Sequence, residues 1–155
     1  MRRPHKKINH LSEDRVYGSK KVSQFINYIM LDGKKTVAEK IVYGAFEIIK
    51  EREGTEPLNV FNEALKNAGP EMEIRSRRVG GANYQVPMPV KVDRQVSLAM
   101  RWLIDSARSS KGKAMSEIIA EELILASKGE GNAVTKKLNT HKMAEANKAF
   151  AHFAW

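Results

Sequence analysis

The stretch EIRSRRVGGANYQVPMPVKV, residues 73–92, decides the fold, because the periodicity of the chain changes there from helical to alternating. In its second half every other residue falls on one face, a pattern typical of a β-strand: Tyr84, Val86, Met88, Val90 and Val92. Its first half, from Ile74 to Val79, alternates in the same way. Gly80 and Gly81 between the halves supply the positive backbone angles that a tight reversal needs. The stretch therefore predicts a β-hairpin over residues 71–92.

Two prolines predict that this hairpin stays two-stranded. Pro87 and Pro89 are two positions apart, so their missing N–H groups lie on the same edge, and a third strand cannot pair there. A two-stranded ribbon is marginally stable alone, and each arm reaches on the order of 25 Å. The segment from Arg75 to Lys91 carries basic residues and no acid. We therefore expect support from outside the domain, by a polyanion.

Composition points to the same class of partner. The 155 residues include 27 Lys plus Arg against 18 Asp plus Glu, a formal net charge of +9. Such an excess favours nucleic acid or an anionic membrane surface as partner. The chain has no apolar run of membrane-spanning length, no signal-peptide pattern at its start and no cysteine. We expect one soluble, cytoplasmic domain over residues 1–155, with no membrane contact, disulfide or thiolate metal site.

The first segment, residues 1–18, is predicted to be an extended basic arm. It is rich in Lys and Arg and poor in apolar residues. Its basic residues Arg2, Arg3, Lys6 and Lys7 fit either a solvated tail or a nucleic-acid contact. The basic hairpin elsewhere in the chain favours contact.

Residues 19–70 predict three amphipathic helices. The first has Ser19 as N-cap, the second has a capping box of Thr36 and Glu39, and the third begins near Pro57. Gly33, Gly54 and Gly69 end them. Lys34 and Lys35, between the first two helices, fit either two solvated lysines or an anion contact at a helix N-terminus.

Residues 93–155 predict three more helices. In the first, Arg94, Arg101 and Arg108 recur every seven residues and align on one face, interrupted by Asp105, which fits a pair with Arg101 or Arg108. The last helix is predicted to bury one apolar face, with basic residues on other faces: Met143, Ala146, Phe150 and Phe153 inside, Lys142 and Lys148 outside. Trp155 either caps this helix or stacks on a partner. The predicted fold is mainly α: a bundle of about six helices with a protruding two-stranded hairpin between helices 3 and 4.

Catalysis has no support in the sequence. There is no Walker loop, no GxGxxG and no HExxH, and the four histidines make no metal-ligand pair. His141 and His152 fit polar positions on a helix. We expect no catalytic residue, metal, cofactor or small-molecule substrate.

Four runs in the chain resemble one family in order and spacing, from about residue 17 to the end. They are DGKKTVAEKIVYGA (32–45), SRRVGGANYQVP (76–87), LAMRWL (98–103) and HKMAEANKAFAHF (141–153). They resemble the bacterial form of small ribosomal subunit protein seven. The resemblance implies a helical fold with a β-ribbon between its third and fourth helices. It also implies a primary binder of the 3′ major domain of 16S rRNA that nucleates assembly of the small-subunit head, with small-subunit proteins nine and eleven as neighbours.

The resemblance also implies where RNA is bound. By position, the rRNA-contacting residues are Arg2, Arg3, Lys6, Lys7, Lys34, Lys35, Arg75, Arg77, Arg78, Arg94, Arg101, Arg108, Lys142 and Lys148. The hairpin tip would stand beside the exit-site tRNA and hinder its release: Val79, Gly80, Gly81, Ala82, Asn83 and Tyr84. From the residues themselves, the hairpin arginines suit forked contacts to phosphates and Tyr84 suits stacking on a base. Three alternatives remain at this point: a DNA-bending protein with a basic arm, a helical protein-interaction scaffold and an enzyme.

Overall fold

The computed structural model of the protein describes residues 12–154 and is mainly helical, as predicted. Its elements are, in order, α1 (Lys20–Ile29), α2 (Lys35–Glu53), α3 (Pro57–Ala68), β1 (Met72–Val79), β2 (Ala82–Pro89), α4 (Val92–Ser109), α5 (Met115–Ser127), α6 (Asn132–Ala146) and the 3₁₀ helix η1 (Lys148–Phe153). The hairpin lies between α3 and α4, which confirms the predicted fold class. The basic residues Arg2, Arg3, Lys6 and Lys7, and also Trp155, lie outside the described residues.

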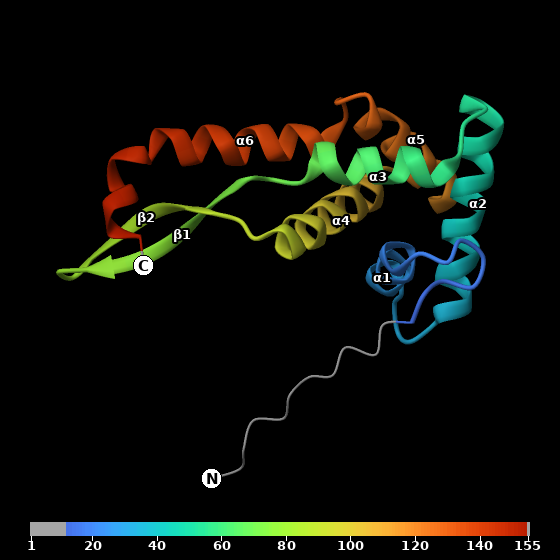
Figure 1. The fold of residues 1–155 in the computed structure, drawn as a ribbon, viewed down its shortest axis with the longest axis horizontal. Helices are drawn as coiled ribbons and strands as arrows, with labels where there is room; N and C mark the ends of the chain where they lie inside the picture. Colours follow the sequence, from blue (N-terminus) through green and yellow to red (C-terminus); the bar gives the residue numbers. More distant parts are fainter. Residues whose placement is uncertain (1–11, 155) are drawn as a thin grey trace, which may run out of the picture.

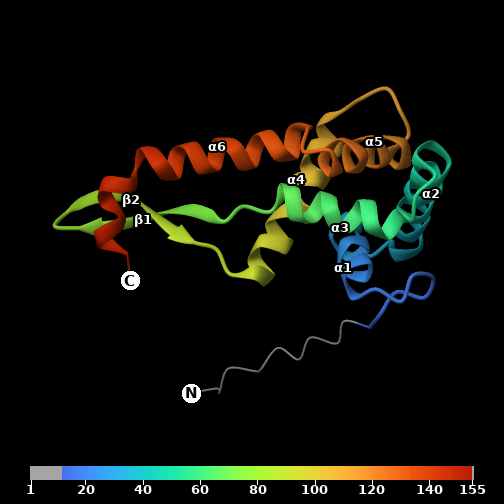
Figure 2. The same ribbon diagram turned by 45° about the horizontal axis from the view of Figure 1, so that its top comes forward.

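The described elements form a helical body with a long projection. Helices α1 to α5 pack together at one end, while the hairpin extends away from them (Figure 1). Helix α6 runs from the body alongside the hairpin, and the chain then turns back onto the strands (Figures 1 and 2). The projection is therefore made of the strands β1 and β2 and of helix α6, which flanks them.

Aromatic rings from three helices form the centre of the body. Phe61 of α3 lies 5.2 Å from Phe25 of α1 and 5.6 Å from Phe46 of α2, measured between ring centroids. All three side chains are fully buried, and α5 adds Leu123 beside them. Burial of each such ring stabilises the fold by about 1.5–3 kcal/mol.

Most predicted helix ends are confirmed, and two are wrong: the capping box of α2, and Gly33 as the end of α1, which stops at Ile29 with Met30 as its C-cap. Ser19 occupies the N-cap of α1, Pro57 stands in the first turn of α3, and Gly54 ends α2 with a left-handed φ of +63°. The capping box of Thr36 and Glu39 does not form, because α2 already begins at Lys35. The Lys35 amide donates to the Gly33 carbonyl at 2.8 Å in this tight turn, and the helix starts two residues before the position that a Thr36 N-cap predicts.

The strand register confirms the prediction made from the prolines. Gly80 and Gly81 have φ angles of +57° and +89° and join the pair Val79 and Ala82. Pro87 faces Ile74, and the Val90 amide donates to Glu71 at 2.9 Å. Since hydrogen-bonded pairs alternate in an antiparallel ladder, Pro87 and Pro89 occupy non-hydrogen-bonded positions and point their nitrogens outward. Strand β2 ends at Pro89, and Val92, predicted on the strand face, begins α4 and is exposed.

Residues 12–18, predicted as the end of an extended arm, form a folded turn instead. The Asp14 carboxylate accepts hydrogen bonds from the amides of Val16 and Tyr17, at 3.1 and 2.9 Å, and from the Tyr43 hydroxyl at 2.7 Å. The Tyr17 ring packs edge-on against Phe46, 5.0 Å away. Burial of Tyr43 and its bond to Asp14 raise the pKa of this phenol. Aromatic packing therefore overrides the polar composition here.

The predicted apolar face of the last helix is also wrong. Met143 is 53% exposed, and α6 ends at Ala146, where the Asn147 side chain donates to the Met143 carbonyl at 2.8 Å. This side-chain bond competes with continued helix, and the chain enters the 3₁₀ turn of η1. Phe150 and Phe153 therefore leave the α6 face and reach the hairpin.

Candidate nucleic-acid interface

The arginine stripe predicted on α4 is present, and each arginine is anchored by a different partner. Arg101 lies over the Tyr28 ring of α1, with its guanidinium carbon 5.4 Å from the ring centroid. Arg108 donates to the Ile29 carbonyl at the end of α1, at 3.2 Å. Arg94 contacts Glu73 at the start of β1. All three side chains are exposed, so the stripe offers positive charge to solvent along one face of α4.

Asp105 does not pair within this stripe. Its carboxylate lies 3.4 Å from the Lys136 ammonium of α6, and not beside Arg101 or Arg108 as the sequence suggested. The Lys136 ammonium also lies 5.6 Å from the Trp102 ring centroid. Packing of α6 against α4 thus gives Asp105 a nearer cation and leaves the arginines without its charge.

A nearly buried carboxylate joins the hairpin to α4. Glu73 has a side chain 11% exposed, and its oxygens lie 2.6 Å from Arg75 Nη2 and 2.7 Å from Arg94 Nη2. Both arginines add bonds from Nε, at 2.8 Å in each case. Burial opposes ionisation of Glu73, but the hydrogen bonds and charges of Arg94 and Arg75 outweigh it and lower the pKa of this carboxyl. Glu73 therefore orients two of the predicted RNA-binding arginines.

The role of Glu73 was missed by sequence reasoning. The signal was present: Glu73 is the one acid within the segment 72–92, and the arginines of the basic arm follow it directly. Side chains of Arg75 and Arg94 remain 47% and 48% exposed, and a guanidinium carries five N–H donors. Both arginines therefore keep surface for a phosphate while Glu73 holds their orientation.

The hairpin is supported from inside the chain, which corrects the expectation of external support. Tyr84 packs against Phe150 and Phe153, with ring centroids 5.3 and 5.0 Å apart. Arg77 donates a hydrogen bond from Nη1 to the Phe153 carbonyl. We call this segment, Lys148–Phe153, the C-terminal clasp. It places Tyr84, predicted to stack on a base, in an aromatic cluster of the protein itself.

A second contact holds the base of the projection. The imidazole Nε2 of His141, on α6, accepts the Glu71 amide just before β1 at 3.0 Å. This requires the neutral ring at that nitrogen. His141 was predicted as a polar helix-face residue; it is half-buried and connects α6 to the strands.

The remaining predicted site residues lie at three exposed places. Arg78 and the tip residues Gly80, Gly81, Ala82 and Asn83 are exposed beyond the clasp, and Val79 is half-buried. Lys34 and Lys35 are the N-cap and first residue of α2. Lys142 and Lys148 lie on α6 and at the start of η1, beside the hairpin. The structure thus groups the predicted cations along the projection, the α4 face and the α1–α2 turn.

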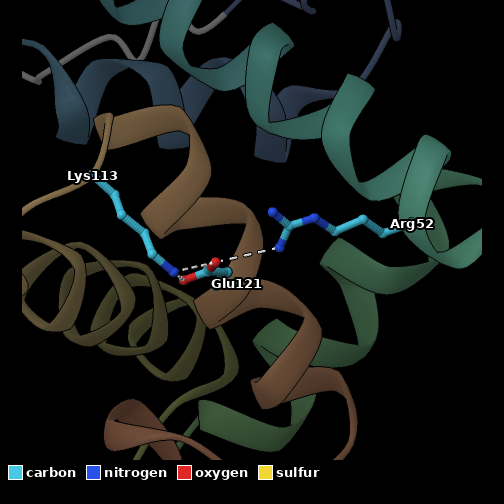
Figure 3. A network of polar contacts seen from close by, with 3 residues as sticks. All are labelled: Arg52, Lys113 and Glu121. Carbon is cyan, nitrogen blue, oxygen red and sulfur yellow. Dashed lines mark hydrogen bonds and ion pairs between the residues drawn. The ribbon is translucent and has the colours of Figure 1, made fainter.

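At the far end of the body, several cations are instead paired with acids. Figure 3 shows Glu121 of α5 between Lys113 and Arg52, at 2.7 and 3.4 Å. Lys128 similarly lies 2.9 Å from Glu53. These pairs connect the end of α2 to α5 and its preceding loop. Positive charge is therefore partly neutralised away from the hairpin.

Within residues 12–154, no group of three His, Asp or Glu side chains is arranged to hold a metal ion. None of the helices in this range has the length and apolarity to cross a membrane.

Comparison with known proteins identifies relatives over almost the whole chain. The family profile described as ribosomal protein S7p/S5e matches residues 1–148. A protein of Thermoanaerobacter sp. (strain X514) named small ribosomal subunit protein uS7 is 55% identical over 154 residues, 99% of each chain. The proteins of that name from Carboxydothermus hydrogenoformans and Thermotoga petrophila are 57% identical over 142 residues (92% of this chain, 91% of the relative) and 52% identical over 155 residues (100% of both).

Replacing the shared carboxylate tests how Glu73 contributes to stability. Because its pKa is lowered in the folded state, its contribution is present above the ordinary value of 4.5 and is lost as the pH falls through the lowered pKa. We expect Glu73→Gln to reduce the free energy of unfolding at pH 7 by about 1–2 kcal/mol, since the partners are half exposed. The difference should shrink by pH 3. Denaturant unfolding at both pH values measures it, with Glu63→Gln on α3 as the control; an equal loss at both would contradict the assignment.

Removing the clasp rings tests the support of the hairpin. The double substitution Phe150→Ala with Phe153→Ala should accelerate amide exchange in β1 and β2 by about tenfold, because aromatic pairs contribute about 0.5–1.5 kcal/mol each. Exchange in α3 and α5 should not change. Leu138→Ala, at an exposed apolar position of α6, is the control. Unaltered strand protection would show that the clasp does not hold the hairpin.

Proposed function

Because the chain belongs to the ribosomal protein S7p/S5e family, we propose that it is a primary binder of the 16S rRNA 3′ major domain and nucleates assembly of the head of the small subunit. Members of this family are structural constituents of the small ribosomal subunit and are not enzymes. Membership places it in the cytoplasmic ribosome and in association with rRNA. The match over residues 1–148 carries the proposal. The arrangement of the site residues also supports it.

The separation of the cationic surfaces supports binding to folded RNA. The arginine stripe, the hairpin arginines and the α1–α2 lysines lie on different elements of one helical framework. A rigid array of this kind matches phosphates that converge from several RNA segments, because folded RNA is recognised mainly by shape and backbone. The protein would fix those segments relative to one another, without bond chemistry.

The exposed end of the hairpin supports the position proposed for the tip, beside the exit-site tRNA. Beyond the clasp the hairpin ends in Gly80 and Gly81, an exposed and uncharged turn. An uncharged tip adds little RNA affinity, so we assign it a steric role beside the exit-site tRNA, where it hinders release. The neutral tip also argues against a DNA-bending arm, which would insert an apolar or basic side chain into a groove.

Exposed apolar residues on α6 support contact with neighbouring proteins. Leu138 and Met143 are each 53% exposed on the helix that flanks the hairpin. Each offers an apolar side chain that a neighbouring protein can bury. We propose small-subunit proteins nine and eleven as the neighbours of this chain.

Charge removal tests the RNA surface. Arg75 and Arg77 bond to Glu73 and to the Phe153 carbonyl, so the probe is Arg78→Gln with Arg101→Gln, which leaves those hydrogen bonds in place and removes the contact of Arg101 with the Tyr28 ring. We expect weaker binding to a 16S 3′ major-domain fragment and a salt dependence whose slope falls by about 1–2, since each lost phosphate contact removes about 0.7–0.9. The control is Lys50→Gln with Lys66→Gln, the same charge loss on exposed positions of α2 and α3. Filter binding across a salt series measures the RNA affinity of both double variants. Equal losses of affinity in the two variants would refute a localised RNA-binding surface.

Shortening the tip tests its proposed separate role. Deleting Arg78, Val79, Ala82 and Asn83 removes two cross-strand pairs and keeps the ladder alternation, so Arg77 and Tyr84 then flank the turn. We expect head assembly to proceed normally and deacylated tRNA to leave the exit site faster in reconstituted ribosomes. Arg78→Gln alone controls for the lost charge. Failure of rRNA binding in the shortened chain, but not in the control, would contradict this division.

A further inference from the structure

An apolar groove opens between the end of α1 and the start of α2. It encloses about 240 Å³ and is lined by apolar side chains that include Met30, Leu31, Val37 and Ile41. Leu31 and Val37 are 61% and 51% exposed, which is high for aliphatic residues. They line the same groove, so they form a small exposed apolar surface rather than two unrelated positions.

The backbone beside the groove is held in an uncommon conformation. Asp32 has a φ of +51° and is the one non-glycine residue in the range 12–154 with a positive φ. Gly33 follows at +73°, and the Lys34 amide closes the turn on the Leu31 carbonyl at 3.0 Å. This turn fixes the backbone between Leu31 and Lys34, which both line the groove. A left-handed non-glycine residue at an exposed surface is a conformation often associated with function.

Exposed lysines lie at and next to the rim of the groove. Lys34 lines it, Lys35 follows at the start of α2, and both are exposed. Arg108 from α4 reaches the Ile29 carbonyl, and Ile29 lines the groove. Asp32 and Lys34 are the two charged residues that line the groove, and Lys35 follows Lys34 outside the lining. An apolar floor with two neighbouring lysines at its margin complements a ligand whose apolar part is flanked by negative charge.

We propose that this groove receives an unstacked nucleobase of the bound rRNA, a subsite that rests on the RNA-binding function proposed above. The base would lie against Leu31 and Val37, while Lys34 and Lys35 contact the phosphates on either side of it. RNA-binding proteins commonly take splayed-out bases from loops and bulges, because the base faces are apolar and the backbone is charged. Aliphatic contacts to those faces tolerate any base, so the groove reads an extruded nucleotide rather than its identity.

Photocrosslinking locates the ligand directly. The full chain with photo-leucine at position 31 is bound to the 16S 3′ major-domain fragment and irradiated, and the RNA is mapped by reverse-transcription stops. We expect one dominant crosslinked nucleotide in an unpaired segment. Crosslinks absent from the RNA, or spread over paired regions, would overturn the proposal.

Binding thermodynamics separates the base from the phosphates. Leu31→Ala with Val37→Ala should weaken binding about five- to tenfold at every salt concentration, with the slope unchanged, because the lost contact is apolar. Lys34→Gln with Lys35→Gln should instead reduce the slope. An abasic site at the crosslinked nucleotide should weaken the wild type by the same factor and add nothing to the double alanine variant. Leu125→Ala, exposed on α5, is the control.

The outcomes distinguish this subsite from the function itself. Thermal unfolding first establishes that the alanine variant is folded, as expected for two exposed side chains. The subsite would be overturned if the double alanine variant bound the RNA with wild-type affinity, or if its loss of affinity added to that caused by the abasic site. Either result would leave the proposed function standing. Loss of a small-subunit protein from reconstituted particles, with RNA affinity intact, would identify a protein groove and also overturn it. Failure of the wild type to prefer the fragment over unstructured RNA would refute the proposed function.

Discussion

A two-stranded ribbon cannot bury enough surface to hold itself rigid, and the rest of this structure depends on how that constraint is met. The outward nitrogens of Pro87 and Pro89 prevent a third strand from pairing at their edge. The chain instead supplies helix α6 and the C-terminal clasp, which run beside the strands (Figure 1). Tyr84, Phe150 and Phe153 form an aromatic cluster far from the main core. The projection can therefore be presented to RNA as an ordered element.

Ion pairs hold the hairpin a second time, by joining its first strand to α4. Arg75 on the strand and Arg94 on α4 repel each other unless a carboxylate lies between them, and Glu73 occupies that place. Its ionised form carries a desolvation cost, and the two arginines offset it. The angle between hairpin and α4 is thereby linked to the orientation of two cations that face solvent. Stability and the geometry of the proposed RNA surface depend on one carboxylate.

Charge is distributed unevenly over the molecule. On the far end of the body, cations such as Lys113 and Lys128 face Glu121 and Glu53. Along α4, Arg94 is paired with the charged Glu73, whereas Arg101 contacts the Tyr28 ring and Arg108 bonds to the Ile29 carbonyl. The ring and the carbonyl carry no net charge, so they leave the positive charge of Arg101 and Arg108 uncompensated. Arg101 and Arg108 therefore offer positive charge to the surface proposed for RNA. This arrangement favours one orientation of approach to a polyanion.

The sequence by itself determined the elements and their order, because these follow from local periodicity and from glycine and proline. Alternation from Ile74 to Val90, the Gly80–Gly81 turn and the Pro57 helix start all depend on neighbours a few residues away. The spacing of Arg94, Arg101 and Arg108 likewise placed them on one face. The family resemblance, from four ordered runs, was also available from the sequence alone and is confirmed.

Only the tertiary structure decided the partners of these residues. Glu73 with Arg94, Asp105 with Lys136, Asp14 with Tyr43 and Tyr84 with Phe153 each join segments far apart in the chain. Helical periodicity predicted the face of Met143, Phe150 and Phe153, but Asn147 ends α6 and sends the two rings to the hairpin. Periodicity describes which side of an element is apolar. Which surface that side meets depends on packing among all the elements, and no local pattern carries that information.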